Sequence, residues 1–273
     1  MHLDDEPVGR VLSRRQAITL LGTAGAALTV AGSGAATAAM PTSSWSPSGD
    51  GRATVDCIAK PEQTEGPYFV DEKLDRSDIR SDPSDGTVAE GAVLALNLGV
   101  LKIGSRGCTP LKNAIVDIWQ CDALGVYSDV ADAGTVGKKF LRGYQTTDRA
   151  GKVRFVTILP GWYAGRTVHF HVKVRTTGTD GNPYEFTSQL YVPDAVTAAY
   201  LAREPYASKG PADTTNATDR FYAAGGDQML LDPRRTGRGY TADFTIGLDL
   251  SDAETGDDDG FEIPPGPAPT PPA

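Results

Sequence analysis

Residues 167–174 read Thr167-Val168-His169-Phe170-His171-Val172-Lys173-Val174. Side chains two positions apart in a β-strand lie on the same face, so His169 and His171 project together. Val168, Phe170 and Val172 point the other way. This alternation predicts a β-strand that presents two imidazoles side by side.

Similar strand patterns recur along the chain as segments rich in β-branched or aromatic residues, with Gly, Pro, Asp or Asn in most of the gaps. The segments are residues 92–103, 113–120, 152–159, 167–175, 185–192 and 240–250. Residues 194–231 differ, because a short helix-forming run is followed by a loop rich in Gly and Pro. With 273 residues and 40% apolar content, the chain can build one sizeable core. We therefore expect an all-β fold, a single β-sandwich with long loops and a short helical excursion.

The first 38 residues have the pattern of an export signal. Arg14-Arg15 precedes an apolar run rich in Gly and Ala, residues 17–31, and Ala36-Thr37-Ala38-Ala39 offers a cleavage site. The paired arginines favour the twin-arginine route. A membrane anchor is the alternative, but the run is shorter than the roughly 20 residues that a spanning helix needs. We expect a secreted protein without stable membrane insertion.

Composition divides the rest of the chain. A linker over residues 39–56 precedes the main domain, residues 57–250, and an acidic, then Pro-rich tail occupies residues 251–273. The net charge is −9, of which the six acids of the tail supply −6. Nothing resembles a phosphate-binding surface, so we expect no nucleic-acid partner. Whether the tail is a spacer or leads to a further module stays open.

Three cysteines, Cys57, Cys108 and Cys121, would meet an oxidising environment after export. One pair is expected to form a disulfide, which leaves one thiol over. The sequence does not choose among the three pairings.

The two histidines of the strand are the only ones that remain once His2 leaves with the signal. A site with three histidine ligands, as in some zinc hydrolases, is therefore excluded. Further metal ligands must carry oxygen or sulfur, and thiolates are disfavoured because exported cysteines tend to be oxidised. Taken alone, a His-x-His pair is more often an ordinary pair on a strand, so its context has to decide.

Two tyrosines stand where they could complete a metal site. Tyr163 lies in a turn-rich connection, residues 159–166, six residues before His169. Tyr127 follows a buried-looking strand at the point where the strand gives way to a loop. Each tyrosine alone is more typical of a packing residue. Carboxylates and tyrosines both remain open as the missing ligands at this point.

Four segments together share the pattern of a known family. They are residues 63–68 (Gln-Thr-Glu-Gly-Pro-Tyr), residues 117–127, residues 159–163 (Leu-Pro-Gly-Trp-Tyr) and residues 166–171 (Arg-Thr-Val-His-Phe-His). Two His, two Tyr and one Arg at matching spacing form a far more specific signal than His-x-His alone. From about residue 57 to about residue 250 the chain resembles the intradiol ring-cleavage dioxygenases, which include the catechol and protocatechuate enzymes.

The resemblance implies a β-sandwich of the intradiol dioxygenase type and a non-haem ferric ion, Fe(III), held by Tyr127, Tyr163, His169 and His171. It also implies that Tyr163 is the ligand released when substrate binds. Phenolate oxygens suit this ion, because a trivalent cation strongly lowers the pKa of a phenol from its usual value of about 10.

Further roles carry over by position. Arg166 matches an arginine that stabilises negative charge on the activated substrate ring, a task suited to a fixed guanidinium. Gln189 matches a glutamine that donates a hydrogen bond near the reacting group. Gly66, Pro67 and Trp162 are expected to line the substrate pocket, although a tight turn explains Gly66 and Pro67 equally well.

The implied reaction is intradiol cleavage of a catechol-type small molecule by O2, giving a muconate-type dicarboxylate without an organic cofactor. Together with export, this suggests breakdown of plant-derived aromatic compounds outside the cell. The interval between Tyr163 and His169 is shorter than in the intracellular catechol and protocatechuate enzymes, and only a linker precedes Cys57. The chain thus resembles a secreted subgroup, for which a homo-oligomer stays open and the preferred catechol is not predicted.

Two other functions compete with this interpretation. A zinc hydrolase could use His169, His171 and one carboxylate, but it gives the paired tyrosines no role. A metal-free β-sandwich binding module fits the export signal, the linker and the strand content equally well.

Overall fold

A computed structural model describes residues 57–237 and 239–251 of the chain. The predictions of an export signal, a linker and a Pro-rich tail lie outside these residues. None of the helices in the described ranges has the length and apolar character that crossing a membrane requires.

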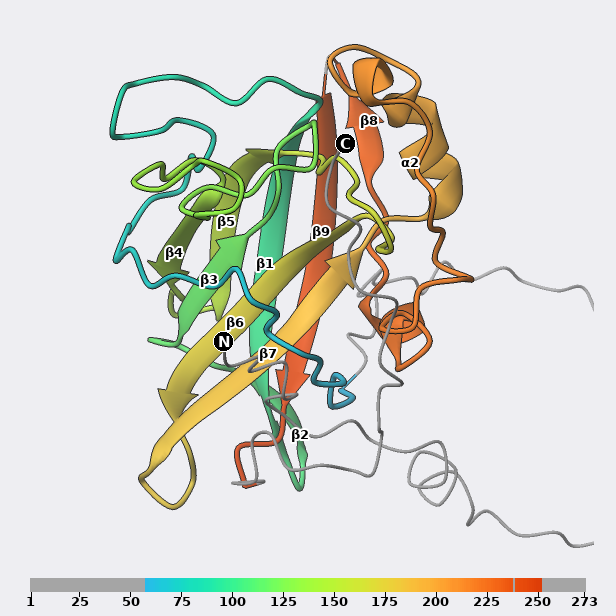
Figure 1. Ribbon diagram of the computed structural model, residues 1–273. Coiled ribbons are helices and arrows are strands. Elements are labelled where there is room, and N and C mark those ends of the chain that lie inside the picture. The colour runs from blue at the N-terminus through green and yellow to red at the C-terminus, as the bar shows by residue number, and fades with distance from the viewer. Residues whose placement is uncertain (1–56, 238, 252–273) are drawn as a thin grey trace, which may run out of the picture. The chain divides into compact units, whose positions relative to one another are not determined.

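One sheet is built around β1 (Val93–Gly104), the longest strand (Figure 1). β1 pairs antiparallel with β2 (Gly107–Pro110) and β5 (Lys152–Ile158), and parallel with β9 (Gly239–Leu248). β9 then pairs with β8 (Arg234–Thr236) at the edge. Along β1, the even-numbered residues from Leu94 to Val100 are buried and the odd-numbered ones are partly exposed. The alternation shows that one face of this sheet covers the core.

The second sheet carries the histidine strand. Its order is β4 (Arg142–Thr146), β3 (Ile115–Trp119), β6 (His169–Thr177) and β7 (Pro183–Tyr191), and every neighbouring pair is antiparallel. Figure 1 shows this sheet lying across β1 and β9, so that the two sheets form a sandwich.

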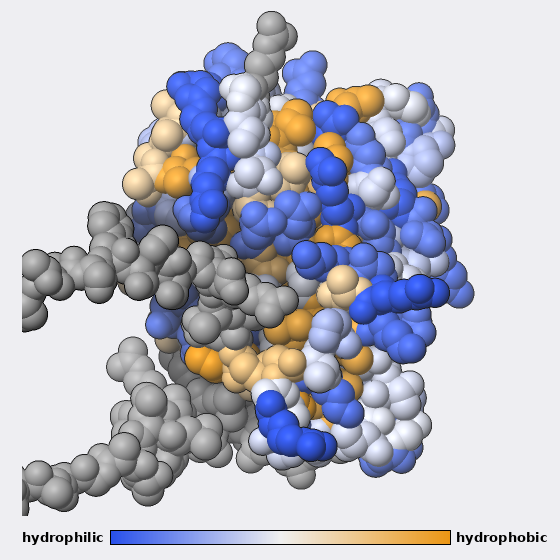
Figure 2. Space-filling model, turned by 180° about the vertical axis from the view of Figure 1, so that it is seen from behind, coloured by the Kyte–Doolittle hydropathy of each residue, from blue (hydrophilic) through white to orange (hydrophobic). Residues whose placement is uncertain are grey.

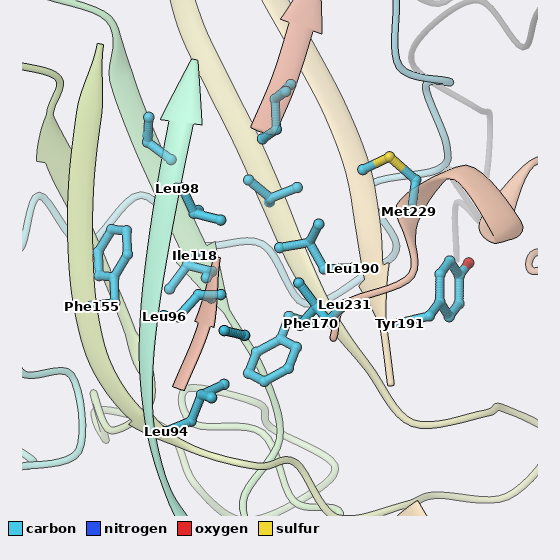
Figure 3. Packing of buried hydrophobic residues seen from close by; sticks show 14 of the residues in the cluster. Leu94, Leu96, Leu98, Ile118, Phe155, Phe170, Leu190, Tyr191, Met229 and Leu231 are labelled. Atoms are coloured by element: carbon cyan, nitrogen blue, oxygen red, sulfur yellow. The ribbon is translucent and has the colours of Figure 1, made fainter. Parts of the chain in front are cut away.

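The core fills the space between the sheets. Leu94, Leu96 and Leu98 of β1 point toward Ile118 of β3 and Phe170 of β6 in Figure 3, and all of them are at most 1% exposed. Burying an aliphatic or aromatic side chain of this size contributes about 1.5–3 kcal/mol. Because the inward-facing residues of β6 are held by this packing, the outward-facing residues, including both histidines, are held in register as well.

The connection from β7 to β8 leaves the sandwich. It contains α2 (Asp194–Leu201) and two 3-10 turns, η1 (Tyr206–Lys209) and η2 (Gly226–Met229). Tyr200 and Tyr206 of this segment are buried and donate hydrogen bonds to the carbonyls of Pro160 (2.7 Å) and Leu159 (2.6 Å). The helical excursion is thereby attached to the turn that leads to Tyr163.

The disulfide joins Cys57 to Cys108, and Cys121 is a buried free thiol. This selects one of the three pairings that the sequence left open. The bridge ties the beginning of the described chain to strand β2.

The expected all-β sandwich with one short helix is confirmed. The predicted strands correspond to β1, β3, β5, β6, β7 and β9, with ends that differ by one or two residues. Strands β2, β4 and β8 were not predicted, because they are short or rich in Gly, Gln and Arg. Viewed from behind, the surface shows small hydrophobic areas among hydrophilic ones (Figure 2).

Candidate metal centre

A row of side chains on the outer face of the second sheet places the candidate site. Trp119 of β3, His171 of β6 and Gln189 of β7 are cross-strand neighbours, and His169 pairs with Tyr191. Phe170, between the two histidines, points into the core. The alternation predicted for residues 167–174 therefore holds, and loops cover the histidine face so that both imidazoles are 2% exposed.

The loop after β3 carries Tyr127 to this face. Asp122 turns the chain, because its carboxylate accepts hydrogen bonds from the backbone N–H groups of Leu124 (2.8 Å) and Val126 (2.9 Å). Gly125 takes a positive φ of 81°, and a Cβ there would lie 2.1 Å from the Trp162 carbonyl oxygen. Only glycine allows so close an approach, so the two tyrosine-bearing loops pack directly against each other.

The turn before β6 carries Tyr163. The N–H of Gly161 donates to the Asp122 carbonyl at 2.9 Å, which joins this turn to the loop of Tyr127. Tyr127 is buried, with 3% of its surface exposed, whereas Tyr163 is partly exposed. The two phenols thus reach the histidines from neighbouring loops, but only one of them is fully enclosed.

The four predicted ligands converge. The Tyr163 hydroxyl lies 3.1 Å from His169 Nε2, the two histidine Nε2 atoms lie 3.2 Å apart, and His171 Nε2 lies 3.2 Å from the Tyr127 hydroxyl. Donors that share one ion at about 2.0–2.1 Å and roughly at right angles stand roughly 3 Å apart. The spacing therefore fits a metal ion held by all four residues.

The tautomer of His169 gives a second test of this fit. Its Nδ1 lies 2.7 Å from the Thr167 carbonyl oxygen, which can only accept, so Nδ1 carries the proton. The lone pair is then on Nε2 and faces the other donors. A metal ligand held by a hydrogen bond through its second nitrogen is the usual arrangement for histidine.

His171 is held in another way. Its ring stacks on the indole of Trp119, with centroids 4.8 Å apart and planes at 9°. Within residues 57–237 and 239–251, neither His171 Nδ1 nor Trp119 Nε1 finds a hydrogen-bond partner. Packing, rather than a protein acceptor, fixes the plane of this ring.

Burial sets the protonation state of the cluster. It holds the pKa of both His169 and His171 well below the ordinary value, with the Arg166 charge acting in the same direction, so both imidazoles are neutral near pH 7. Burial also raises the pKa of Tyr127 and Tyr163 above the ordinary value for a phenol. Two neutral nitrogens and two hard oxygens suit a trivalent ion, which would displace both phenol protons.

Arg166 lies beside the cluster and is held from two sides. Its Nε donates to the Asp219 carboxylate at 2.8 Å, and its Nη2 donates to Gln189 Oε1. The guanidinium also lies 4.1 Å from the centroid of the Phe221 ring. A cation fixed in this way suits the stabilisation of negative charge on a bound molecule.

The remaining predicted residues are placed unequally. Gln189 is fully buried beside His171, but its amide donates to the Thr64 carbonyl at 3.2 Å. Gly66 lies over His171, since a Cβ on it would stand 3.4 Å from His171 Cε1, and Pro67 is exposed. Trp162 donates its indole N–H to the Gly210 carbonyl at 3.0 Å. The structure thus brings Gln189 and Gly66 to the centre and directs the Trp162 indole toward the loop of Gly210.

Five residues of this region were not identified from the sequence. They are Tyr68, Trp119, Arg142, Tyr191 and Asp219. Tyr68 stacks on Tyr127 at 4.6 Å between centroids, and Arg142 donates to Ser128 Oγ at 2.7 Å, next to Tyr127. Strand parity could have placed Tyr191 on the same face as Gln189, since the two residues are two apart on one strand. Nothing local in the sequence marks Asp219 as part of the site, because its contacts with Arg166 and Thr167 join residues 53 and 52 positions apart.

The zinc-hydrolase alternative requires a carboxylate beside the two histidines. No group of three or more His, Cys, Asp or Glu side chains able to hold a metal occurs in the part of the chain that the structure describes. The oxygen donors beside the histidines are the two phenols. The donor set therefore does not fit a His2-carboxylate zinc site.

Comparisons with known proteins agree with this geometry. A family model described as a dioxygenase matches residues 64–192, a range that includes all four donors. The protocatechuate 3,4-dioxygenase beta chain of Burkholderia cepacia is 29% identical over 133 residues, which are 42% of this chain and 55% of that protein. The match therefore spans about half the length of this curated relative.

Two solved structures match over most of their own length. An intradiol ring-cleavage dioxygenase from Tetranychus urticae has a TM-score of 0.62 and 27% identity, and the match covers 71% of this chain and 96% of that one. The dioxygenase domain of a dioxygenase carbohydrate-binding protein fusion from Streptomyces sp. SirexAA-E is 30% identical with a TM-score of 0.52. That match covers 70% of this chain and 99% of the domain.

Proposed function

Since this chain belongs to the intradiol ring-cleavage dioxygenases, we propose that it is a ferric enzyme that opens catechol-type rings with O2 to give muconate-type dicarboxylates. The observation that carries the proposal is the convergence of two phenols and two imidazoles, with donor atoms 3.1–3.2 Å apart, on one face of the sheet. Tyr127, Tyr163, His169 and His171 would hold the ion. When bound, Fe(III) supplies the Lewis acidity that activates a chelated catecholate toward O2.

The two tyrosines are suited to different tasks. Tyr127 is enclosed and lies under the ring of Tyr68, so it stays in place. Tyr163 is partly exposed on a short turn, so its oxygen can leave the cluster and accept one proton from a substrate hydroxyl. Its high intrinsic pKa makes the released phenolate a good base, because burial favours the protonated form.

Arg166 stabilises the negative charge that a doubly deprotonated substrate brings to the site. Its guanidinium is fixed before substrate arrives, so little reorganisation is needed. Gln189 Oε1 accepts a hydrogen bond from Arg166 Nη2 and so holds the guanidinium from a second side.

The site of action belongs to the same proposal. Arg14-Arg15, the apolar run of residues 17–31 and the Ala-Thr-Ala-Ala segment support export by the twin-arginine route. We expect the enzyme to act outside the cell on catechols derived from aromatic polymers. Detection of the processed chain in culture medium, lost when Arg14-Arg15 becomes Lys-Lys, would test this part separately.

The activity is tested with purified protein by metal analysis and an absorption spectrum, then by adding catechol without air and admitting O2. We expect one ferric ion per chain, a tyrosinate-to-iron charge-transfer band that shifts with catechol, and muconate formation once O2 is present. A colourless protein that stays inert after reconstitution with Fe(III) would refute the proposal. A panel of catechol, protocatechuate and hydroxylated catechols would identify the preferred substrate.

A further inference from the structure

Asp219 is a fully buried carboxylate that lies behind the candidate centre. Its side chain is 0% exposed and accepts four hydrogen bonds. Oδ2 accepts from Arg166 Nε (2.8 Å) and from the Thr167 N–H (2.8 Å), and Oδ1 accepts from the N–H groups of Phe221 (2.7 Å) and Tyr222 (2.9 Å). One carboxylate therefore joins a distant turn to two consecutive residues of the site.

The same turn holds Thr167 a second time. Asn216 Oδ1 accepts a hydrogen bond from the Thr167 hydroxyl at 2.7 Å, and Asn216 Nδ2 donates to the Val192 carbonyl at 3.0 Å. Asn216 is itself buried. The backbone N–H and the side chain of Thr167 are thus both fixed by the turn at residues 215–222.

These bonds end at the metal ligand His169. The Thr167 carbonyl accepts the Nδ1 proton of His169, and this contact decides that the lone pair of His169 lies on Nε2. Movement of Thr167 would release the imidazole from this orientation. His171 Nδ1 has no such acceptor among the described residues, so the two histidines differ in how they are held.

The same carboxylate aims Arg166. Asp219 binds the Nε edge, Gln189 binds Nη2 and the Phe221 ring covers one face of the guanidinium. Without Asp219, a single hydrogen bond and one ring contact would remain, and Arg166 could rotate about its side chain. A flexible cation loses its advantage at a reacting group, because positioning has to be complete before the reaction.

We infer that Asp219 is a positioning residue of the enzyme, which acts through Arg166 on the bound substrate and through Thr167 on His169. The inference rests on the proposed function for its Arg166 part. It predicts that loss of Asp219 affects substrate turnover and ferric-ion retention separately from overall stability.

The first test is a double-mutant cycle with Asp219→Asn, Arg166→Met and the double variant. Asp219→Asn keeps the shape but places an amide N–H against groups that are already donors. We expect kcat/KM for catechol to fall about 10–100-fold, the range usual for residues that orient ligands. In the Arg166→Met background, the same change should reduce kcat/KM by a clearly smaller factor, because one of the two targets of Asp219 is already absent.

Asp82→Asn is the matched control. Asp82 is also 0% exposed and accepts hydrogen bonds from the backbone N–H groups of Ser84 and Lys139, both at 2.8 Å, and neither bond involves Arg166, Thr167 or a candidate ligand. This variant should lower the unfolding temperature and leave kcat/KM within about twofold. If Asp219→Asn behaved like Asp82→Asn, the positioning role would be overturned. An equal reduction of kcat/KM with and without Arg166 would overturn its Arg166 part.

The second test does not depend on turnover. Ferric-loaded variants are dialysed against a chelator, and the intensity and energy of the tyrosinate-to-iron band are recorded. Asp219→Asn should lose iron faster than wild type and Asp82→Asn should not, because Asp219 holds Thr167 and Asp82 does not. Wild-type protein that binds iron but opens no catechol would refute the proposed function and leave this comparison decisive. Equal iron loss from all three proteins would refute the His169 part.

Discussion

Gly66 has two separate reasons to be glycine. Its φ is +72°, and a Cβ there would stand 3.4 Å from Cε1 of His171. We expect Gly66→Ala to lower stability by about 1 kcal/mol through its backbone conformation. The added Cβ would also stand in direct contact with the imidazole of His171, and we expect this contact to speed the loss of ferric ion to a chelator.

Gly86→Ala separates the two effects. Gly86 has nearly the same φ, +78°, but a Cβ on it would meet nothing within 4 Å. This variant should show a similar loss of stability in denaturant unfolding and unchanged retention of iron. If both alanines released iron at the same rate, the contact with His171 would have no functional weight.

Arg142 supports the Tyr127 side of the centre. It is 3% exposed and donates to Ser128 Oγ (2.7 Å), to the Ser128 carbonyl and to the Tyr68 carbonyl (3.1 Å). Arg142 thereby joins Ser128, which follows Tyr127 in the chain, to Tyr68, whose ring stacks on Tyr127. Arg142→Met would leave buried carbonyls without donors and should reduce the free energy of unfolding by about 1–3 kcal/mol.

The tyrosinate-to-iron band should also change in Arg142→Met, because Tyr127 loses support. Arg142→Lys should recover little, since an ammonium cannot reach three acceptors in a planar fork. Arg154→Met, at an exposed position of β5, is the control and should change stability by less than about 0.5 kcal/mol. An unaltered band and unfolding curve for Arg142→Met would contradict the assignment.

At the residue scale, the sequence predicts the four metal-ligand residues better than it predicts the residues that hold them in place. His169 and His171 follow from strand parity, and the Tyr positions follow from their resemblance to a family motif. Arg142 and Asp219 reach the site from strands and turns that are distant in the chain, so no local pattern marks them. Trp162 was predicted to line the pocket from its position in a family motif, but that position does not reveal that its indole N–H donates to the Gly210 carbonyl.

At the scale of elements, strands β3 and β6 are linked by charges as well as by backbone hydrogen bonds. Asp117 of β3 accepts two hydrogen bonds from Arg175 of β6, each 2.9 Å long. Burial is the largest influence on this carboxyl and raises its pKa from 3.8 to about 6, although Arg175 opposes the change. The folded protein therefore holds the Asp117 proton more tightly than the unfolded chain does.

The sign of the pH effect follows from this difference. Stability from Asp117 is fully present below pH 4 and is lost as pH rises from about 4 to about 6, by up to about 3 kcal/mol. The unfolding free energy of wild type minus that of Asp117→Asn should decrease over this interval. A carboxyl that titrates below 3.8 by NMR would contradict the prediction and show that Arg175 outweighs burial.

The long strands were predictable because each buries a regular apolar face. The inward-facing residues of β1 and β6, such as Leu94, Leu96 and Phe170, belong to one core cluster, and this packing requires an apolar residue at every second position. β4 reads Arg-Gly-Tyr-Gln-Thr, which has no apolar alternation, and it is a strand because β3 supplies its hydrogen-bond partners. The parallel pairing of β1 with β9 connects distant segments and was equally beyond local patterns.

At the scale of the whole molecule, the Cys57–Cys108 bridge closes a loop across a sequence separation of 51 residues. This loop contains the segment that continues to Gln63 and Gly66 above His171. The segment has further attachments, because Lys60 N–H donates to the Gly247 carbonyl (3.0 Å) and Gln63 N–H donates to the Thr187 carbonyl (2.8 Å). The disulfide should therefore affect global stability more than the local order of the centre.

For a loop of this length the restriction of the unfolded chain is worth about 4 kcal/mol, so the Cys57→Ser/Cys108→Ser variant should lose about that much unfolding free energy. Below its unfolding transition it should retain ferric ion as wild type does, because the backbone contacts hold the segment.

Mass spectrometry after alkylation provides the check on the thiols. The oxidised native protein should take up no label, since burial raises the pKa of Cys121 to about 12 and encloses its thiol. Mild reduction should expose two labelling sites, and only unfolding should expose the third. Labelling of Cys121 in the native state, or stability unaffected by loss of the bridge, would show that the chain relies on other constraints to hold this face together.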